Sequence, residues 1–366
     1  MRLNAVREAF LKPLQMVGGV VEKRSTIPVL ANILIQLSQS RATFIASDSE
    51  IELRSSMSVE KGEDGEITIQ GKKLIDLVRS LSDGCQVDLK VNNQKATLSA
   101  ARSKFTLSTL PANTFPHAEM GEVTFKLSVP GAKLKELFDR TSFAMAQQDV
   151  RYYLNGLLLE LRSGELRAVA TDGHRLSICD TSSEMPESVD RQVIVPRKSV
   201  LELARLIGSG EDIVELEFAR NLLRATVGDS VLTTKLIDGR FPEYLAVIPV
   251  GTDKTALMSK EEFKAAMQRV AILSNEKFRG VRVEMNSGML RLIANNPEQD
   301  EAIEEVAAEC VTNNLGIGFN VNYLLEAVNA VEGSEVMLCL RDSASSCLLR
   351  SKDSERVRHV VMPLRL

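Results

Sequence analysis

The stretch AVATDGHRLSI, residues 168–178, indicates how the chain is organised, because the chain contains two further copies of its pattern. In each copy an apolar run reaches a polar corner, as in TFIASDSEIEL (43–53) and RLIANNPEQDE (291–301). The corner residues are Asp48, Asp172 and Asn296, which are 124 residues apart (172 − 48 and 296 − 172). Self-similarity at a fixed period indicates a repeated structural unit.

Helical patterns also occur three times. The stretches LIDLVRSL from Leu74, VLELARLI from Val200 and LLEAVNAV from Leu324 place apolar residues at i, i+1, i+3, i+4 and i+7, which forms one apolar helical stripe. Another helix should open each unit, and a strand should end it. The apolar pairs of the opening helices are Phe10/Leu14, Leu134/Phe138 and Phe263/Met267, and the closing strands carry Leu110, Leu236 and Met362.

The segments between these landmarks alternate polar and apolar residues and contain Asn-Asn, Arg-Asn and Gly-Asp corners, as β-hairpins do. Each unit therefore combines two helices with an antiparallel sheet, which defines an α+β domain. The chain is expected to hold three such domains, at residues 1–122, 123–250 and 251–366.

Composition narrows the class of protein. The 366 residues are 44% hydrophobic and 26% charged, which is typical of a globular protein. No apolar run approaches the roughly 18 residues that span a bilayer, and the first residues lack the apolar core of a signal peptide. Five Cys without a C-x-x-C pair indicate reduced thiols and a cytoplasmic location. The net charge of −4 still allows a basic face on an acidic body.

Catalytic motifs are scarce. The chain has no GxxxxGK[ST] loop, and His117, His174 and His359 fall in no zinc-binding spacing, so neither a metal nor a cofactor is expected. His174 could act as a general base oriented by Asp172, or it could stand at a hairpin corner whose Asp-Gly pair supplies the turn. The related corners carry Ser-Glu and Pro-Glu, which favours the hairpin.

Charged residues recur with the repeats. Lys and Arg, with acids among them, flank most of the repeated helices, for example at Lys72, Lys133, Arg197 and Lys260. If equivalent helices face one way, these cations suit an evenly charged phosphate backbone; otherwise they are solvated helix faces. The acidic run PEQDEAIEE (297–305) could bind a metal, face solvent or meet a basic surface of another copy.

Several longer motifs resemble one known family. They are QQDVRYYLNG (147–156), VATDGHRL (169–176), DGRFPEY (238–244), ILSNEKFRGVR (272–282), ANNPEQ (294–299) and VVMPLRL (360–366). From residue 11 to its end the chain is similar to the bacterial sliding clamp, the β subunit of DNA polymerase III. The resemblance implies a non-catalytic processivity factor. It also implies a homodimer whose six domains form a ring around duplex DNA, with helices lining the hole.

The resemblance also implies three sets of contact residues. DNA contacts match at Arg24, Lys72, Gln148, Tyr152 and Tyr153. A pocket for partner peptides matches at Leu154, Thr171, Gly173, His174, Arg175, Leu176, Pro242, Val247, Ser346, Val360 and Met362. Dimer contacts match at Ile272 and Leu273 against Phe105 and Leu107, with Lys73, Arg102 and Lys104 facing Glu298, Asp300, Glu301 and Glu304.

The implied partners are duplex DNA, the replicative polymerase α subunit, the clamp loader δ subunit, other DNA polymerases, ligase and mismatch-repair proteins, and no membrane. Three places depart from the family pattern: Gln147 replaces a His, Leu245-Ala246 an Arg pair, and Leu364 a Met. Loss of the Arg pair makes the pocket rim less basic. Two alternatives are a monomeric peptide-binding scaffold and a hydrolase that uses His174.

Overall fold

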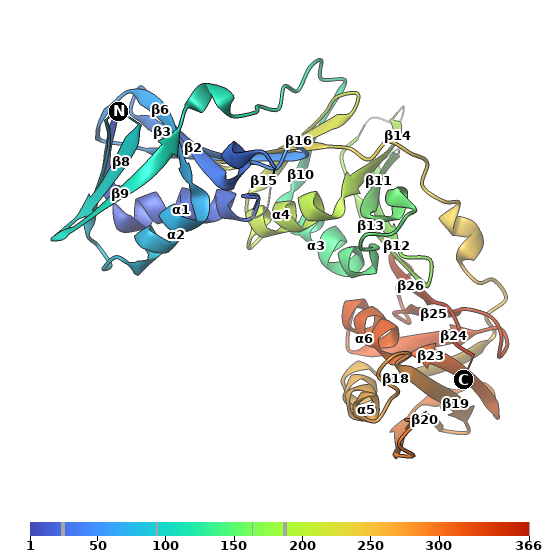
Figure 1. The fold of residues 1–366 in the computed structure, drawn as a ribbon. Coiled ribbons are helices and arrows are strands. Elements are labelled where there is room, and N and C mark those ends of the chain that lie inside the picture. Colours follow the sequence, from blue (N-terminus) through green and yellow to red (C-terminus); the bar gives the residue numbers. More distant parts are fainter. Residues whose placement is uncertain (23–25, 93, 163, 186–188, 366) are drawn as a thin grey trace. The chain divides into compact units, whose positions relative to one another are not determined.

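The computed structural model describes residues 1–22, 26–92, 94–162, 164–185 and 189–365 (Figure 1). The chain divides into two compact units, residues 1–134 with 201–236 and residues 135–200 with 237–366. The second repeat therefore contributes strands to both units. Within the described residues, no helix combines the length and the apolar character needed to cross a membrane.

The first unit contains one 13-stranded antiparallel sheet, in the order β10-β15-β16-β17-β4-β3-β2-β6-β9-β8-β7-β1-β5. Helices α1 (Arg7–Gly18) and α2 (Gly71–Ser80) lie side by side against it (Figure 1). The strands are β1 (Arg2–Val6), β2 (Asn32–Ser38), β3 (Arg41–Ser47), β4 (Ile51–Ser58), β5 (Lys61–Glu63), β6 (Gly65–Gln70), β7 (Gln86–Asn92), β8 (Lys95–Ala100), β9 (Ser103–Leu110), β10 (Phe125–Pro130), β15 (Ile213–Phe218), β16 (Leu222–Val227) and β17 (Ser230–Lys235).

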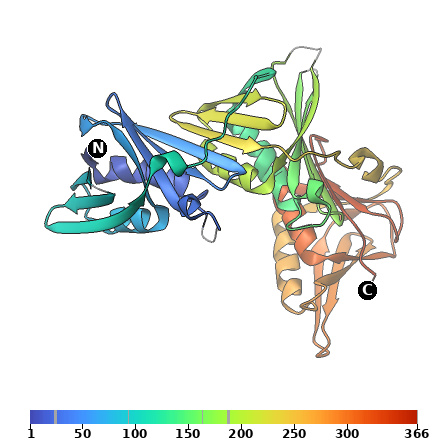
Figure 2. The same cartoon turned by 45° about the horizontal axis from the view of Figure 1, so that its top comes forward.

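The second unit contains a nine-stranded sheet, β14-β11-β12-β13-β26-β25-β24-β18-β22, and a four-stranded sheet, β21-β20-β19-β23. Helices α5 (Lys260–Ile272) and α6 (Val321–Ala330) lie side by side in this unit (Figure 2). The strands are β11 (Gly156–Arg162), β12 (Glu165–Thr171), β13 (Arg175–Ser182), β14 (Asp190–Pro196), β18 (Lys254–Ser259), β19 (Gly280–Asn286), β20 (Met289–Asn295), β21 (Glu301–Ala307), β22 (Glu309–Cys310), β23 (Leu315–Asn320), β24 (Glu335–Leu340), β25 (Cys347–Arg350) and β26 (Val357–Val361).

The six helices expected from the sequence are all present. The remaining two are α3 (Gly131–Thr141) and α4 (Arg197–Ile207). The stripe residues Leu74, Val78 and Leu324 are buried, as the periodicity predicts. Leu77, Leu81, Ala204 and Leu325 are half-buried, and Leu201 is exposed, at 46%. Among the described residues there are also five short 3-10 helices: η1 (Pro28–Ala31), η2 (Ala112–Thr114), η3 (Ser142–Ala144), η4 (Tyr152–Leu154) and η5 (Tyr244–Val247).

Strand register confirms the threefold repeat. The central hairpins are β2-β3, β11-β12 and β19-β20, and their strands pair in equivalent registers. The matching pairs, each 124 residues after the last, are Leu34 with Ile45, Leu158 with Val169, and Arg282 with Ile293. The strand that follows each hairpin has a different partner in each repeat. Strand β4 pairs with β17 and β13 pairs with β26, whereas β21 is the last strand of its sheet.

The closing strands are shifted by one residue from the predicted alignment. Leu236 and Met362 each follow the last residue of a strand, and they are not equivalent. The amide of Lys235 donates to the carbonyl of Glu50 at 2.9 Å, and the amide of Met362 donates in the same way to His174 at 2.9 Å. Lys235 is therefore the structural counterpart of Met362.

Two of the three polar corners are Asx turns, in which a side-chain oxygen accepts from the backbone amide two residues further along the chain. Asp48 Oδ1 accepts from the amides of Glu50 and Ile51, both at 2.9 Å. Asp172 Oδ1 makes the same contacts one repeat later, at 2.9 and 3.1 Å. Asn296 Oδ1 accepts from the amide of Asp300 at 2.9 Å across a longer corner. An Asp or Asn therefore recurs at each corner because its side-chain oxygen holds the turn.

Replacing Asp48 with Ala should remove both turn hydrogen bonds and lower the free energy of unfolding of the first unit by about 1 kcal/mol. Asp48→Asn is the matched control, because Asn keeps the acceptor oxygen and already serves at residue 296. Guanidinium denaturation followed by circular dichroism measures both variants. Equal destabilisation by Ala and Asn would contradict the turn explanation.

Candidate functional site

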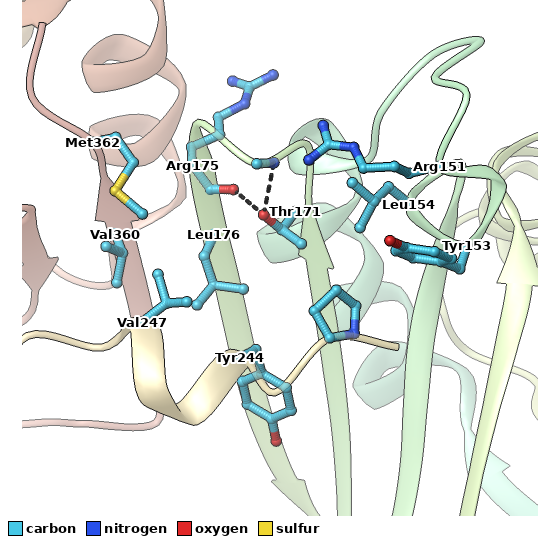
Figure 3. A pocket seen from close by; sticks show the side chains of 12 residues that line it. Arg151, Tyr153, Leu154, Thr171, Arg175, Leu176, Tyr244, Val247, Val360 and Met362 are labelled. Atoms are coloured by element: carbon cyan, nitrogen blue, oxygen red, sulfur yellow. Dashed lines mark hydrogen bonds between the residues drawn. The ribbon is translucent and has the colours of Figure 1, made fainter. Parts of the chain in front are cut away.

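A cavity of about 160 Å³ lies in the second unit, between strands β12, β13 and β26 and the segment 242–247 (Figure 3). Its lining is Arg151, Tyr153, Leu154, Thr171, Gly173, Arg175, Leu176, Pro242, Tyr244, Val247, Val360 and Met362. The structure thus brings together nine of the eleven residues expected at a peptide pocket. Ser346 and His174 are not part of this lining. Arg151 and Tyr244 were not expected, and Tyr153 was expected to contact DNA.

The floor of this pocket is apolar because two neighbouring strands each place an aliphatic side chain there. Leu176 on β13 pairs with Val360 on β26, and both are almost fully buried. Tyr244 closes the adjacent wall with its ring, and its hydroxyl points away from the other lining side chains (Figure 3). That hydroxyl donates to Glu160 and accepts from Arg167 at 3.2 Å. Burial, together with the bond to Glu160, raises the pKa of Tyr244 to about 12.

A polar corner forms the rim of the pocket. Thr171 Oγ1 donates to the carbonyl of Arg175 at 2.6 Å and accepts from the amide of Gly173 at 3.1 Å (Figure 3). Gly173 has φ +89°, and a Cβ there would meet the Arg151 guanidinium at 2.9 Å. Asp149 holds this guanidinium at 2.8 Å, and the hydrogen bonds from Arg151 lower the pKa of Asp149 to about 2. The positive φ therefore favours a glycine at this position.

His174 lies on the other side of the corner, in a polar cavity of about 440 Å³ that also includes Gln147, Arg197 and Tyr323. Its ring stacks on Tyr323, with centroids 6.4 Å apart and planes at 20°. Asp172 accepts from the backbone amide of His174 and from Arg175. Because Asp172 is engaged in the turn and the ion pair, the geometry matches the hairpin interpretation of this corner.

Arg175 connects the corner to α6. Its guanidinium bonds Glu326 and Asp172, donates to the carbonyl of Phe143 at 2.8 Å and lies 4.5 Å from the centroid of the Tyr323 ring. Charge, hydrogen bonding and ring contact together fix this side chain. Throughout the described chain, no group of three or more His, Cys, Asp and Glu side chains is arranged to hold a metal ion.

The residues expected to contact DNA have different environments. Arg24 lies outside the described residues. Lys72 is exposed in the first turn of α2, and Gln148 is exposed with φ +55°. Tyr152 is 57% exposed, and its ring meets Tyr153 edge-on at a centroid distance of 5.7 Å. Tyr152 is therefore accessible to a large ligand, whereas Tyr153 faces the apolar pocket.

Of the residues expected at a dimer contact, Lys104, Phe105 and Leu107 lie on β9 and Glu301 and Glu304 lie on β21, and both strands have an open edge. Strand β9 pairs with β6 only through Thr109 and Leu110, so residues 103–108 have a free edge. Strand β21 is the last strand of its sheet. Along the first edge, Arg102 and Lys104 are exposed, Phe105 and Leu107 are half-buried, and Lys73 is exposed on α2. Near the second edge, Ile272 is 76% exposed, Leu273 is half-buried, and Glu298, Asp300 and Glu301 are exposed.

Glu304 differs from the other acidic residues of this set. Its carboxylate forms a two-point ion pair with Arg269 of the same chain, at 2.7 and 2.8 Å. These hydrogen bonds lower the pKa of Glu304. Glu304 is therefore already paired within its own chain, whereas Glu301 is an exposed carboxylate at the start of β21.

The whole chain matches the DNA polymerase III beta subunit family: its N-terminal domain over residues 1–119, its central domain over 128–243 and its C-terminal domain over 245–365. The beta sliding clamps of Pseudomonas aeruginosa and Escherichia coli are 48% and 41% identical to it, with full coverage of both chains. The crystal structure of the P. aeruginosa sliding clamp bound to griselimycin is also 48% identical. It covers both chains completely with a TM-score of 0.96. A Caulobacter crescentus sliding clamp with polyethylene glycol bound is 36% identical, with a TM-score of 0.95 over 100% of this chain and 99% of the other.

Three antiparallel α+β domains and a pocket beside a polar corner thus define a protein of the clamp fold. The chain belongs to the DNA polymerase III beta subunit family, the bacterial sliding clamps. It is a processivity factor for DNA polymerase, and the family is not catalytic. The expected clamp fold and the expected role as a processivity factor are confirmed, and the hydrolase alternative is wrong; the peptide pocket stays a prediction.

The buried His359 should make the stability of the second unit depend on pH. It lies on β26 beside Val360, is 1% exposed, and shares a hydrogen bond of 3.0 Å with Ser177. Burial lowers its pKa from 6.5 to about 3. Below pH 6.5 the unfolded chain binds the proton first, so the stability of the second unit should fall by about 1.4 kcal/mol per pH unit until the pH approaches the folded pKa.

Urea unfolding of the wild type and of His359→Gln between pH 7.5 and 4.5 tests this prediction. The variant should lose less stability per pH unit, whatever its stability at neutral pH. Parallel slopes for the two proteins would assign the acid sensitivity to other residues.

Proposed function

We propose that this clamp is a ring-shaped homodimer that encircles duplex DNA and slides on it without sequence specificity. Its three domains would span residues 1–122, 123–250 and 251–366, so that two copies supply six. The observation that carries the proposal is the pattern of strand edges. The chain pairs β4 with β17 and β13 with β26, and it leaves the equivalent edges of β21 and β9 open.

The repeat indicates what should fill these edges. Strands β4, β13 and β21 are equivalent hairpin strands, and β9, β17 and β26 are equivalent closing strands. Each hairpin strand joins the closing strand of the next repeat, so β21 requires the closing strand of a repeat that this chain does not contain. Strand β9 of a second copy has this role. Because two copies exchange the contact in both directions, the arrangement closes as a ring.

Side chains beside the two edges support this pairing. Exposed Ile272 on one copy would cover Phe105 and Leu107 on the other, and Lys104 would approach Glu301. Exposed ion pairs contribute little to stability, whereas burial of apolar area contributes in proportion to the area. Glu304 would have to give up or share its bond to Arg269. The apolar contact and the backbone ladder should therefore dominate.

Contacts with DNA should be weak and exchangeable, because the closed ring, and not its affinity for phosphates, would keep the protein on DNA. Exposed Lys72, Gln148 and Tyr152 are suited to such contacts, together with Arg24. Cations that meet phosphates neutralise charge without reading sequence. The ring of Tyr153 lines the apolar cavity, so we assign this residue mainly to the pocket. Only the edge of its ring would contact DNA.

The apolar pocket would capture short peptides of the replicative polymerase α subunit, the clamp loader δ subunit, other DNA polymerases, ligase and mismatch-repair proteins in the cytoplasm. It offers a buried aliphatic floor, an aromatic wall and a polar corner, the features of a peptide anchor site. Next to the lining residue Tyr244, Leu245 is 46% exposed, and some relatives carry an Arg pair at positions 245 and 246. The pocket should therefore show little preference for acidic peptides.

Light scattering should give a solution mass near twice 40.3 kDa for the wild type at micromolar concentration. Ile272→Arg should shift the mass toward the monomer, because a charge would be buried against Phe105 and Leu107. Val250→Arg is the matched control, since Val250 is 75% exposed, close to the 76% of Ile272, but lies away from the proposed interface. A wild-type monomer at high concentration would support the monomeric scaffold instead.

The ring itself is tested by retention on DNA. Wild-type clamp loaded onto circular duplex should remain bound at high salt and should leave when a nuclease cuts the circle. Ile272→Arg should not remain on either form. Equal retention on linear and circular DNA would mean that affinity and not closure holds the protein.

Met362→Ala should weaken binding of a fluorescently labelled peptide from the polymerase α subunit about tenfold, as loss of an apolar anchor contact commonly does. Ser346→Ala should leave binding unchanged, because Ser346 does not line the cavity. Fluorescence anisotropy measures both. Equal effects of the two substitutions would place the peptide elsewhere than in this pocket.

A further inference from the structure

A second corner cavity, of about 340 Å³, lies in the first unit where β3 turns into β4. It is lined by the corner residues 47 and 49–52, by the segment 116–119, and by Asn221, Leu222 and Lys235. None of the DNA, peptide or dimer residues assigned above belongs to it. The cavity is thus a hollow of the fold without an assigned role.

This cavity is built on the same backbone arrangement as the apolar pocket. Its corner stands 124 residues before the pocket corner, and the connecting segment repeats Phe115-Pro116 as Phe241-Pro242. Lys235 bonds the corner as Met362 does in the next repeat. Equivalent buried residues also lie beneath the two hollows: Leu34, Ile45 and Phe115 in one, Leu158, Val169 and Phe241 in the other. The fold therefore makes this hollow twice.

The side chains of the two hollows differ in polarity. Glu52 occupies the place of Leu176, because Ser47 pairs with Glu52 as Thr171 pairs with Leu176. The Glu52 side chain is 1% exposed and satisfied: it accepts from Arg54 at 2.6 Å and from the amide of Ala118 at 3.1 Å, with His117 at 3.5 Å. Lys235 replaces Met362 at the mouth. An apolar anchor residue would therefore lose its partners here.

The mouth has an excess of negative charge. Glu50 pairs with Lys235 at 3.2 Å, and both side chains are at least half exposed. Glu119 is exposed and has no ion-pair partner among the described residues. Of the three carboxylates in the lining, Glu52 is paired with Arg54 and Glu50 with Lys235, so the charge of Glu119 is the one left uncompensated among the described residues.

We propose that this cavity is a second binding site, which accepts an arginine side chain from an extended segment of a partner protein. A planar guanidinium can bond one carboxylate with two parallel hydrogen bonds, and it loses less hydration than an ammonium. Glu119 and Glu50 at the mouth supply the acceptors, and the Ser and Asn side chains around them supply further polar contacts. The equivalent hollow of the second repeat would take an apolar anchor, so one chain would offer two sites of opposite preference.

Saturation-transfer NMR on the full-length clamp tests this proposal with two small probes, N-acetyl-arginine methylamide and N-acetyl-norleucine methylamide. The arginine probe should bind the wild type. Glu50→Gln with Glu119→Gln should weaken it about fivefold or more, the combined factor of two exposed charge contacts. Glu122→Gln is the matched control from the same segment and should have no effect. Lys235→Met removes a competing cation and should strengthen binding.

The outcomes separate this site from the apolar pocket. Met362→Ala should weaken the norleucine probe and leave the arginine probe unchanged. If the double Gln variant binds the arginine probe as well as the wild type and Glu122→Gln do, the second site is wrong. Failure of the norleucine probe alone would instead count against the apolar pocket and leave the arginine site standing.

Discussion

Backbone hydrogen bonding at strand edges determines how the repeats of this protein join. An edge strand presents unpaired amides and carbonyls, and folded proteins cover or pair them. Here the hairpin strands β4 and β13 are paired by β17 and β26, the closing strands of the following repeats. A chain of three repeats makes two such strand pairings. It leaves unpaired the edge of one hairpin strand, β21, and the edge of one closing strand, β9. In the proposed ring, a second copy would pair these two edges.

The same joint creates the hollows beside the corners. A closing strand reaches its neighbour's hairpin just past the corner, and the connecting segment crosses above it. The corner residues do not fill this hollow, because their side chains are held in an Asx turn. Asp172, for example, accepts from two backbone amides of the turn. What the hollow can bind then depends on a few side chains. Leu176 and Met362 make one hollow apolar, while Glu52 and Lys235 make the other polar.

Local pattern was sufficient for the elements and their repetition. The helices, the corners and the 124-residue period followed from the spacing of residues such as Leu74 and Asp172, because helical stripes and turn chemistry are local properties. Most of the pocket followed from resemblance, and it would not have followed from spacing alone. Leu154, Leu176, Val247 and Met362 meet only after distant strands pair.

The differences between the expected pocket residues and the observed cavity lining have a common cause. His174 and Ser346 fall outside the apolar lining, and Arg151 and Tyr244 fall inside it. Each outcome depends on partners far along the chain: the ring of His174 stacks on Tyr323, and the Tyr244 hydroxyl is held by Glu160 and Arg167. The one-residue shift between Leu236 and Lys235 likewise appears only in the hydrogen bond to Glu50. Position relative to a motif does not determine such contacts.

Charge and closure are linked in the proposed ring. A protein that holds DNA by affinity alone needs many phosphate contacts, and each of these slows movement and makes binding sensitive to salt. A closed ring needs few, so the chain can keep its net charge of −4 and still enclose a polyanion. The acids are then free for other contacts: Glu304 binds Arg269, Asp149 fixes Arg151 at the pocket rim, and Glu52 anchors the segment beside its corner. In the proposed ring, closure holds the DNA, so the surface needs few cations to bind phosphates. The acidic residues can then take part in contacts within the protein.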